Sequence, residues 1–265
     1  MKIVVCVKYV PDAQSERTFS SDHTTERSSV DGLLSELDEY AVEEALAVAE
    51  NTDDEDGEVV VITMGPDEAA TAIKKALQMG AHAGIHLNDD AIAGSDAVAT
   101  SLVLAAAIRK VGEDGPVDLV LTGLASTDGV MSVVPAMLAE RLGLPQVTFA
   151  SELTVQEGAV TIRRDGDVAS ETIEASLPAV VSVTDQINEP RDPSFKGIMA
   201  AKKKPVQTWA LDDLGVAADE VGLGAAWTQV VSVAQAPPRS QGEVVTDEGS
   251  GGQALADFLT ARKFA

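Results

Sequence analysis

The stretch Glu58-Val-Val-Val-Ile-Thr-Met-Gly-Pro-Asp67 decides the fold of this chain. Its first seven residues form a nearly continuous apolar run, which is typical of a parallel strand buried on both faces. Gly65-Pro66-Asp67 then predicts a turn into a helix over residues 68–79, which Gly80 ends. Residues 83–87 predict the next strand. A strand, a crossover helix and a second strand indicate a right-handed βαβ unit with parallel strands.

Strand and helix patterns alternate along the rest of the chain as well. We expect the strands after residue 146 to extend the sheet with antiparallel pairing. The pattern predicts an α/β fold with a doubly wound, mostly parallel sheet of the Rossmann-like type. The further strands are expected at residues 3–10, 117–122, 147–154, 158–164, 171–175 and 179–184, and the further helices at 35–50, 96–111 and 134–142.

Two polar segments interrupt this pattern, and the last part of the chain departs from it. Residues 12–32 predict an excursion with a short hairpin, and residues 51–57 predict a solvated acidic loop. We expect one α/β domain over residues 1–205 and an extended arm over residues 206–265, which ends in a short helix at 253–263. Because a long tail is uncommon inside a compact domain, we expect the arm to wrap a partner subunit.

The charge balance restricts the classes of partner. The chain has 43 acidic and 19 basic residues, for a net charge of −24. This excess argues against nucleic acid and anionic membranes as main partners. It favours a protein adapted to a salt-rich cytoplasm, where multimolar salt screens charges beyond about 3 Å. An acidic protein from an ordinary cytoplasm is the alternative.

Other features of the sequence also predict a cytoplasmic protein that is not embedded in a membrane. Cys6 is the single cysteine, so no internal disulfide is available, as is usual in a reducing cytoplasm. No apolar run reaches the roughly 18 residues of a membrane span, and the charged first residues do not predict a signal peptide.

A basic, proline-bracketed segment at residues 188–205 stands out in this acidic chain. Its three prolines exclude a central strand or a long helix over most of its length. Phe195 and Met199 are apolar side chains among cations, which include Arg191 and Lys196. An apolar anchor with charges around it is typical of a docking loop. The alternative is an ordinary surface loop that folds back on its own domain.

The carboxyl ends of the expected strands are the place where a doubly wound sheet binds ligands. The loop at residues 123–134 follows one strand and runs into a helix N-terminus. Its small residues allow backbone amides to approach an anion, and Ser126, Thr127, Asp128 and Ser132 add polar groups. The loop is neither a Walker loop nor a dinucleotide G-x-G-x-x-G motif. A tight turn before a capped helix is the alternative.

Catalytic and metal-binding patterns are otherwise weak. His82 and His86 straddle Gly84 and would not share a helix face, which does not favour a metal site. Cys6 is expected to be a small buried residue and not a nucleophile. The acidic pairs Asp38-Glu39 and Glu43-Glu44 are expected on a solvated helix face. The lysines at 202–204 suit either phosphate or the steering of an acidic partner.

Eight short motifs, in the right order, give the chain a family resemblance. Residues 1–216 resemble the β subunit of electron transfer flavoproteins, whose fold is related to adenine-nucleotide α-hydrolase-like domains. The segment at 188–205 carries the strongest match, and Asp213-Leu-Gly215 follows at the usual distance. The other matching motifs are Val4-Val-Cys-Val-Lys-Tyr-Val-Pro11, Asp38-Glu-Tyr-Ala-Val-Glu-Glu-Ala-Leu46, Met64-Gly-Pro66, Ala76-Leu-Gln-Met-Gly-Ala81, Asp118-Leu-Val-Leu-Thr-Gly123, Leu144-Pro-Gln-Val-Thr148 and Leu177-Pro-Ala-Val-Val181.

The resemblance implies an electron carrier subunit without bond-breaking chemistry of its own. A partner α subunit would hold the redox FAD in a mobile domain, which this chain would cradle. The resemblance further implies that flavin-dependent dehydrogenases dock on this chain and that a membrane quinone oxidoreductase accepts the electrons. It assigns docking to Arg191, Phe195, Lys196, Ile198 and Met199.

The resemblance also implies a nucleotide in this chain, which is AMP in ordinary members and a second FAD in electron-bifurcating ones. The pocket maps to Cys6, Ser35, Glu36, Leu37, Asp38, Met64, Gly123, Ala125, Ser126, Thr127, Asp128, Gly129, Met131, Ser132, Val133 and Val134.

The chain departs from the family pattern in the phosphate loop. Family members usually have a second acid where Val130 stands and a glutamine where Val133 stands, while Asp128 is kept. Two alternatives therefore stay open beside the simple carrier. One is an electron-bifurcating subunit with a second FAD, and the other is a nucleotide-binding regulatory module of the same architecture. An adenylate-using enzyme is a third, which the missing phosphate-loop motifs weaken.

Overall fold

The computed structural model describes residues 1–51, 57–239, 242 and 244–264. It divides into two compact units, Met1–Val231 and Ser232–Ala265. The acidic loop expected at residues 51–57 lies, apart from its two ends, outside the described residues. Within the described part of the chain, no helix is both long and apolar enough to cross a membrane.

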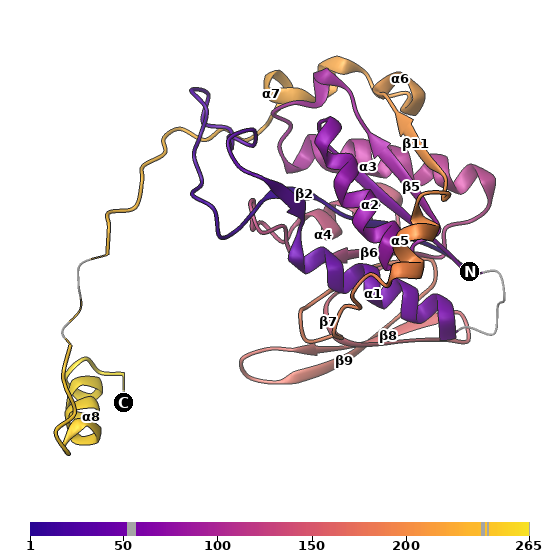
Figure 1. Ribbon diagram of the computed structural model, residues 1–265. Helices are drawn as coiled ribbons and strands as arrows, with labels where there is room; N and C mark the ends of the chain where they lie inside the picture. The colour runs from indigo at the N-terminus through magenta and orange to yellow at the C-terminus, as the bar shows by residue number, and fades with distance from the viewer. Residues whose placement is uncertain (52–56, 240–241, 243, 265) are drawn as a thin grey trace. The chain divides into compact units, whose positions relative to one another are not determined.

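A nine-stranded sheet forms the centre of the first unit (Figure 1). The strand order is β11-β5-β4-β1-β6-β10-β7-β8-β9, and only the pairings among β7, β8 and β9 are antiparallel. The predicted α/β fold with a mostly parallel sheet is confirmed. The strands are β1 (Lys2–Cys6), β4 (Glu58–Met64), β5 (Ala83–Leu87), β6 (Leu119–Gly123), β7 (Gln146–Gln156), β8 (Ala159–Asp165), β9 (Ser170–Ser176), β10 (Ala179–Val183) and β11 (Val206–Trp209).

Helices cover both faces of this sheet and agree well with the predicted ones. The long helices are α1 (Glu36–Asn51), α2 (Ala70–Met79), α3 (Ala97–Val111) and α4 (Val134–Leu142). Shorter ones are α5 (Phe195–Ala201), α6 (Leu211–Leu214) and α7 (Gly222–Ala225), with 3-10 turns at Asp67–Ala69, Asp90–Ile92, Gly112–Asp114 and Ala218–Glu220.

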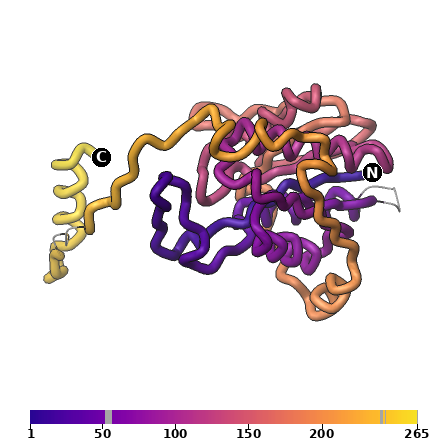
Figure 2. The backbone as a smooth tube through the Cα atoms, turned by 90° about the horizontal axis from the view of Figure 1, so that it is seen from above, coloured from indigo at the N-terminus to yellow at the C-terminus, as the bar shows by residue number. Residues whose placement is uncertain are grey.

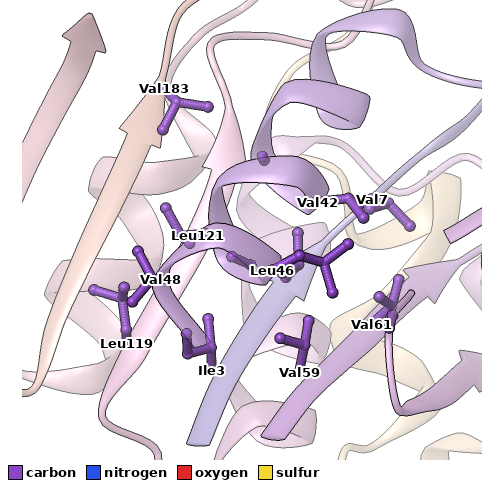
Figure 3. Close-up of a cluster of buried hydrophobic side chains, with 14 of the residues drawn as sticks. Ile3, Val7, Val42, Leu46, Val48, Val59, Val61, Leu119, Leu121 and Val183 are labelled. Atoms are coloured by element: carbon purple, nitrogen blue, oxygen red, sulfur yellow. The ribbon is translucent and has the colours of Figure 1, made fainter. Parts of the chain in front are cut away.

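Each face of the sheet has its own aliphatic core. On one face, side chains of α1 such as Val42 and Leu46 pack against Ile3 and other strand residues (Figure 3). Ile73 of α2 belongs to the same cluster. On the other face, α3, α4 and α6 pack against the alternate strand residues. Helices cover both faces of the sheet, and this explains why the central strands are apolar along almost their whole length.

The first strand is shorter than predicted. β1 ends at Cys6, whereas one strand over residues 3–10 was expected. Val7 still donates its N–H to Ile62, but the Lys8 N–H turns to the Asp38 carboxylate, so the chain leaves the sheet there. It then forms a separate two-stranded sheet from β2 (Tyr9–Pro11) and β3 (Gly32–Leu34).

Between β2 and β3 lies the expected excursion. Phe19 and Thr25 pair across it as an antiparallel bridge, in agreement with the short hairpin that the sequence predicts. In Figure 2 the excursion is the indigo loop that extends from the body of the first unit.

The boundary between domain and arm differs from the expectation. Residues 206–231, expected in the arm, belong to the first unit. β11 pairs in parallel with β5, and Leu211, Val216 and Val221 are buried in the core. The sequence pattern is weak here because the edge strand is short and the helices last barely one turn. The second unit contains α8 (Gly251–Ala261), close to the helix predicted at 253–263.

Candidate functional site

The chain reverses its direction of winding between β1 and β6, which lie next to each other in the sheet. From β1 the chain proceeds outward through β4 and β5, and β6 then pairs on the other side of β1. Cys6 of β1 lies level with Ile62 of β4 and Thr122 of β6. Ligands of doubly wound sheets bind outside the carboxyl ends of the strands at such a switch point. The loop after β6 and the first turn of α1 both lie there.

Asp128 holds the loop at residues 124–133 in place through two ion pairs. Its carboxylate is almost fully buried and accepts from Lys8 Nζ at 2.9 Å and from Arg27 Nη2 at 2.6 Å. These two cations and a hydrogen bond from Ser126 hold the pKa of Asp128 well below its ordinary value, against the opposing effect of burial. The carboxylate therefore stays ionised at all physiological pH values.

Two further contacts hold Thr127, the neighbour of Asp128. Arg17 Nη2 donates to the Thr127 carbonyl oxygen at 2.6 Å, and the Thr127 N–H donates to Ser35 Oγ at 3.4 Å. The loop is thus tied to the excursion, to the chain after β1 and to the start of α1. Lys8, Arg17 and Arg27 were not predicted as site residues. The one signal that could have indicated them is the scarcity of cations in this acidic chain.

Asp38 joins α1 to the end of β6. Its side chain is buried, and Oδ2 accepts from the Lys8 N–H at 2.8 Å. A Cβ atom on Gly123 would lie 2.6 Å from Asp38 Oδ1, so only glycine fits at this crossing of strand and helix. Burial, with the nearby Asp38 charge, raises the pKa of the Cys6 thiol to about 12. Cys6 is accordingly a buried, protonated thiol, as predicted.

The Asp38 carboxyl gives the fold a testable pH dependence. Burial raises its pKa from 3.8 to about 7, although the Lys8 N–H and the Lys8 charge oppose this shift. The native state therefore binds a proton that the unfolded chain releases above about pH 4, so this group stabilises the fold at low pH. That contribution is lost as the pH rises through about 7.

We expect Asp38→Asn, compared with wild type, to gain stability as the pH rises. The rise of the pKa from 3.8 to about 7 sets an upper limit of about 4 kcal/mol on how far the stability difference between the two proteins changes from pH 4 to pH 8. Chemical denaturation of both proteins across this pH range measures it. A difference that stays constant with pH would show that Asp38 titrates normally.

The second half of the loop has the backbone pattern of an anion site. Val130 and Ser132 adopt left-handed φ values of 51° and 56°, which is rare for a β-branched valine. Such residues occur in the backbone nests that bind phosphates. The loop leads into α4, and the described residues provide no side-chain cap for its first turn. The N-terminus of α4 therefore has free amides for an anion.

Buried hydroxyl groups without partners support the same interpretation. Within the described residues, Thr127 Oγ1 and Thr63 Oγ1 are buried and have no hydrogen-bond partner. Thr127 lies in the loop, and Thr63 lies beside Met64 at the end of β4. Because a buried polar atom without a partner is unfavourable, these atoms suit a polar ligand at the switch point. The residues present fit a nucleotide phosphate through backbone amides and one hydroxyl.

Not every residue assigned to the pocket contributes a polar contact to it. Among the described residues, no hydrogen bond or ion pair links Glu36, Met64 or Met131 to the loop, and Glu36 and Met131 are exposed. Ser35, Leu37, Asp38, Gly123 and the first part of the loop do come together. Ala125, Gly129, Ser132, Val133 and Val134 lie along the loop itself and at the start of α4.

Two acidic residues expected on a solvated face of α1 are buried. Asp38 serves the site, and Glu44 accepts from Asn188 Nδ2 at 3.0 Å. This hydrogen bond offsets part of the loss of hydration of the Glu44 carboxyl group. Nothing in the sequence near Glu44 reveals its partner, which lies 144 residues away.

The expected docking residues lie in or beside α5. Phe195, Lys196, Ile198 and Met199 are exposed there, with Phe195 81% exposed. Arg191 differs, because its guanidinium group binds Glu43 and Glu50 of α1. Lys204 is one of the three lysines that were expected to suit phosphate or an acidic partner, and it is engaged within the chain: its Nζ donates to backbone carbonyl oxygens of Leu77 and Gly80 at 2.9 Å.

His82 and His86 have structural partners. His82 Nδ1 accepts from the Val59 N–H at 3.0 Å, and His86 Nε2 lies 3.0 Å from the carbonyl oxygens of Gly65 and Pro66. The part of the chain that the structure describes contains no cluster of three or more side chains suited to a metal ion.

Comparison with known proteins identifies the family. The model of the electron transfer flavoprotein domain matches residues 22–214. The chain is 47% identical to the electron transfer flavoprotein subunit beta of Mycobacterium tuberculosis over 98% of both chains, and 34% identical to that of Megasphaera elsdenii over 100% and 98%. It is 36% identical to subunit CarD of the caffeyl-CoA reductase-Etf complex of Acetobacterium woodii over 93% and 92%. The chain belongs to the electron transfer flavoprotein family, as a β subunit.

Proposed function

We propose that this chain pairs with an α subunit in a heterodimeric electron transfer flavoprotein and binds a structural nucleotide at the switch point. The observation that carries the proposal is the loop at residues 124–133, which Lys8, Arg17 and Arg27 hold beside a buried, unpartnered hydroxyl group. A loop fixed in this way before the ligand arrives loses little conformational entropy on binding.

The nucleotide of this chain is AMP in our proposal. Amides of the loop and of the first turn of α4 would hold its phosphate, and Thr127 Oγ1 would add a hydrogen bond. Lys8 and Arg27 would balance the phosphate charge, although Asp128 neutralises part of theirs. Val130 and Val133 offer no polar side chain, so the backbone has the larger share of the contacts.

The carrier role divides between the two subunits. The FAD of the α subunit would accept and release the electrons, while this chain cradles the FAD domain and has no bond-breaking chemistry of its own. Exposed apolar side chains of α5 would dock flavin-dependent dehydrogenases, and a membrane quinone oxidoreductase would be the acceptor. The C-terminal arm would wrap the α subunit.

We also propose that the acidic surface adapts the chain to a salt-rich cytoplasm. With a net charge of −24, self-repulsion destabilises the compact state at low ionic strength, and salt screens it. We expect the melting temperature to rise steadily from about 0.1 M to about 3 M KCl. Calorimetry over this range measures it, and a melting temperature that salt leaves unchanged would contradict the adaptation.

Co-expression of this chain with an α subunit from the same organism tests the carrier role. We expect a stable complex with a flavin spectrum, and bleaching of that spectrum when a reduced flavin-dependent dehydrogenase is added. A chain that purifies alone, without flavin, and accepts no electrons would contradict this function and favour a regulatory nucleotide-binding module.

A further inference from the structure

The docking segment, residues 188–205, is fastened to α1 at its beginning by Arg191. The Arg191 backbone N–H donates to Glu43 Oε2 at 3.1 Å, and Nε donates to the same oxygen at 2.8 Å. Nη2 donates to Glu43 Oε1 at 2.9 Å and to Glu50 Oε2 at 3.1 Å, and Nη1 donates to Glu50 Oε1 at 2.7 Å. All three guanidinium nitrogens are therefore engaged within the chain. Forked pairs of this kind fix geometry as well as charge.

Asn188 strengthens the same attachment from the buried side. Its Nδ2 donates to the Tyr40 carbonyl oxygen at 3.1 Å and to Glu44 Oε2 at 3.0 Å. The contacts span more than 140 residues of sequence, so they fix the segment to α1 and not merely to its neighbours. Both attachments are made to residues 40–50 of one helix, α1.

Contacts with α2 fasten the middle and the end of the segment. A Cβ atom on Gly197 would lie 2.5 Å from the Gln78 carbonyl oxygen, so the backbone of α5 lies directly against the end of α2. Lys204 Nζ donates to the carbonyl oxygens of Leu77 and Gly80, which the helix end leaves without partners. The segment then continues into β11 of the sheet.

Between these attachments α5 has no buried residue of its own. Seven residues are too few for a stable isolated helix, so its order must come from the attachments. Phe195, Ile198 and Met199 share one face at helical spacing and are exposed, at 81%, 36% and 47%. The attachments thus hold a short helix with its apolar face open to a partner.

We propose that Arg191, with Glu43 and Glu50, is a positioning residue that keeps α5 formed before a flavin-dependent dehydrogenase binds. The inference rests on the proposed docking function of α5. In this role Arg191 supports docking from within the chain, whereas the family resemblance assigns it to the docking residues themselves. A preformed helix avoids the entropy loss of ordering on binding and so favours the complex. The alternative is a segment that folds only on the dehydrogenase.

The test compares variants of the co-purified heterodimer with the dehydrogenase that reduces the wild type. Arg191→Gln removes the guanidinium group and its paired hydrogen bonds to Glu43 and Glu50. Arg191→Lys keeps the positive charge but has a single donor group. Glu50→Gln is a milder change, at the exposed carboxylate. Arg163→Gln is the matched control, because Arg163 of β8 also binds two carboxylates, Glu152 of β7 and Asp165 of β8.

We expect Arg191→Gln to speed amide exchange in residues 195–201 about tenfold and to raise KM for the heterodimer about tenfold, with kcat unchanged. Arg191→Lys and Glu50→Gln should change both quantities less, in the same direction. Arg163→Gln should change neither.

A second variant separates failure of the positioning role from failure of docking. If Phe195→Ala raises KM but Arg191→Gln does not, the docking role of α5 is supported and the positioning role of Arg191 is overturned. If Arg191→Gln raises KM while amide exchange stays at the wild-type rate, Arg191 contacts the dehydrogenase directly and the positioning role is again overturned. If neither variant changes KM, α5 is not the docking site and both proposals fail.

Discussion

Replacing Gly123 by alanine is expected to lower the free energy of unfolding by about 2 kcal/mol and to abolish nucleotide binding. The new methyl group would lie 2.5 Å from the Leu37 carbonyl oxygen and 2.6 Å from Asp38 Oδ1. Neither atom can move away easily, because Leu37 lies in the first turn of α1 and the Asp38 carboxylate accepts a hydrogen bond from the Lys8 N–H. Strand β6 and helix α1 must therefore separate at the switch point.

Gly112→Ala is the matched control for this variant. Gly112 has a helical φ of −68°, and among the described residues no atom beyond its chain neighbours and its own helix backbone lies within 4 Å of a Cβ built there. We expect this variant to be neutral or slightly more stable, because alanine restricts the unfolded chain. Chemical denaturation in KCl gives the stabilities, and calorimetric titration of the heterodimer with AMP gives the affinities. Equal stability and affinity of the two variants would contradict the close packing at Gly123.

Replacing Phe195 by alanine is expected to weaken electron transfer from a flavin-dependent dehydrogenase by about 1–3 kcal/mol if the ring is the anchor of the docking face. The side chain is 81% exposed, so its removal should change the stability of the chain itself by less than about 0.5 kcal/mol. An effect on transfer without an effect on stability is the mark of a contact with a partner.

Val168→Ala is the control, because Val168 is 99% exposed at the turn between β8 and β9, away from α5. Lys196→Gln should matter less than Phe195→Ala at multimolar salt, where screening weakens exposed charges. Stopped-flow reduction of the flavin measures all three. Wild-type kinetics for Phe195→Ala would exclude this ring as the anchor.

Much of the fold could be predicted because its signals are local. The apolar run of β4, the Gly-Pro turn and the glycine after α2 lie within 30 residues of each other, and each has a direct physical meaning. The two cores follow from these runs, since a strand that is apolar on both faces requires a layer of helices on each side. β11 escaped prediction because an edge strand of four residues leaves almost no pattern.

The position of the site could be predicted from the sequence, but the contacts within it could not. The carboxyl ends of β1 and β6 were predictable from the topology, and Asp128 from its motif. The partners of Asp128 were not, because Lys8 lies 120 residues away and Arg27 lies 101 residues away. The partners of Arg191 were not predictable for the same reason, since its carboxylates lie more than 140 residues earlier. The sequence alone does not indicate whether a charged side chain pairs within its own chain or with another protein.

The most direct test of the account is the identity of the nucleotides in the complex. The chain is co-expressed with its α subunit, the complex is purified in multimolar KCl and denatured, and the released nucleotides are identified by mass spectrometry. We expect one FAD and one AMP per complex. A second FAD in place of AMP would reassign the loop at residues 124–133 to flavin binding, and a complex with FAD and no second nucleotide would contradict the proposed site.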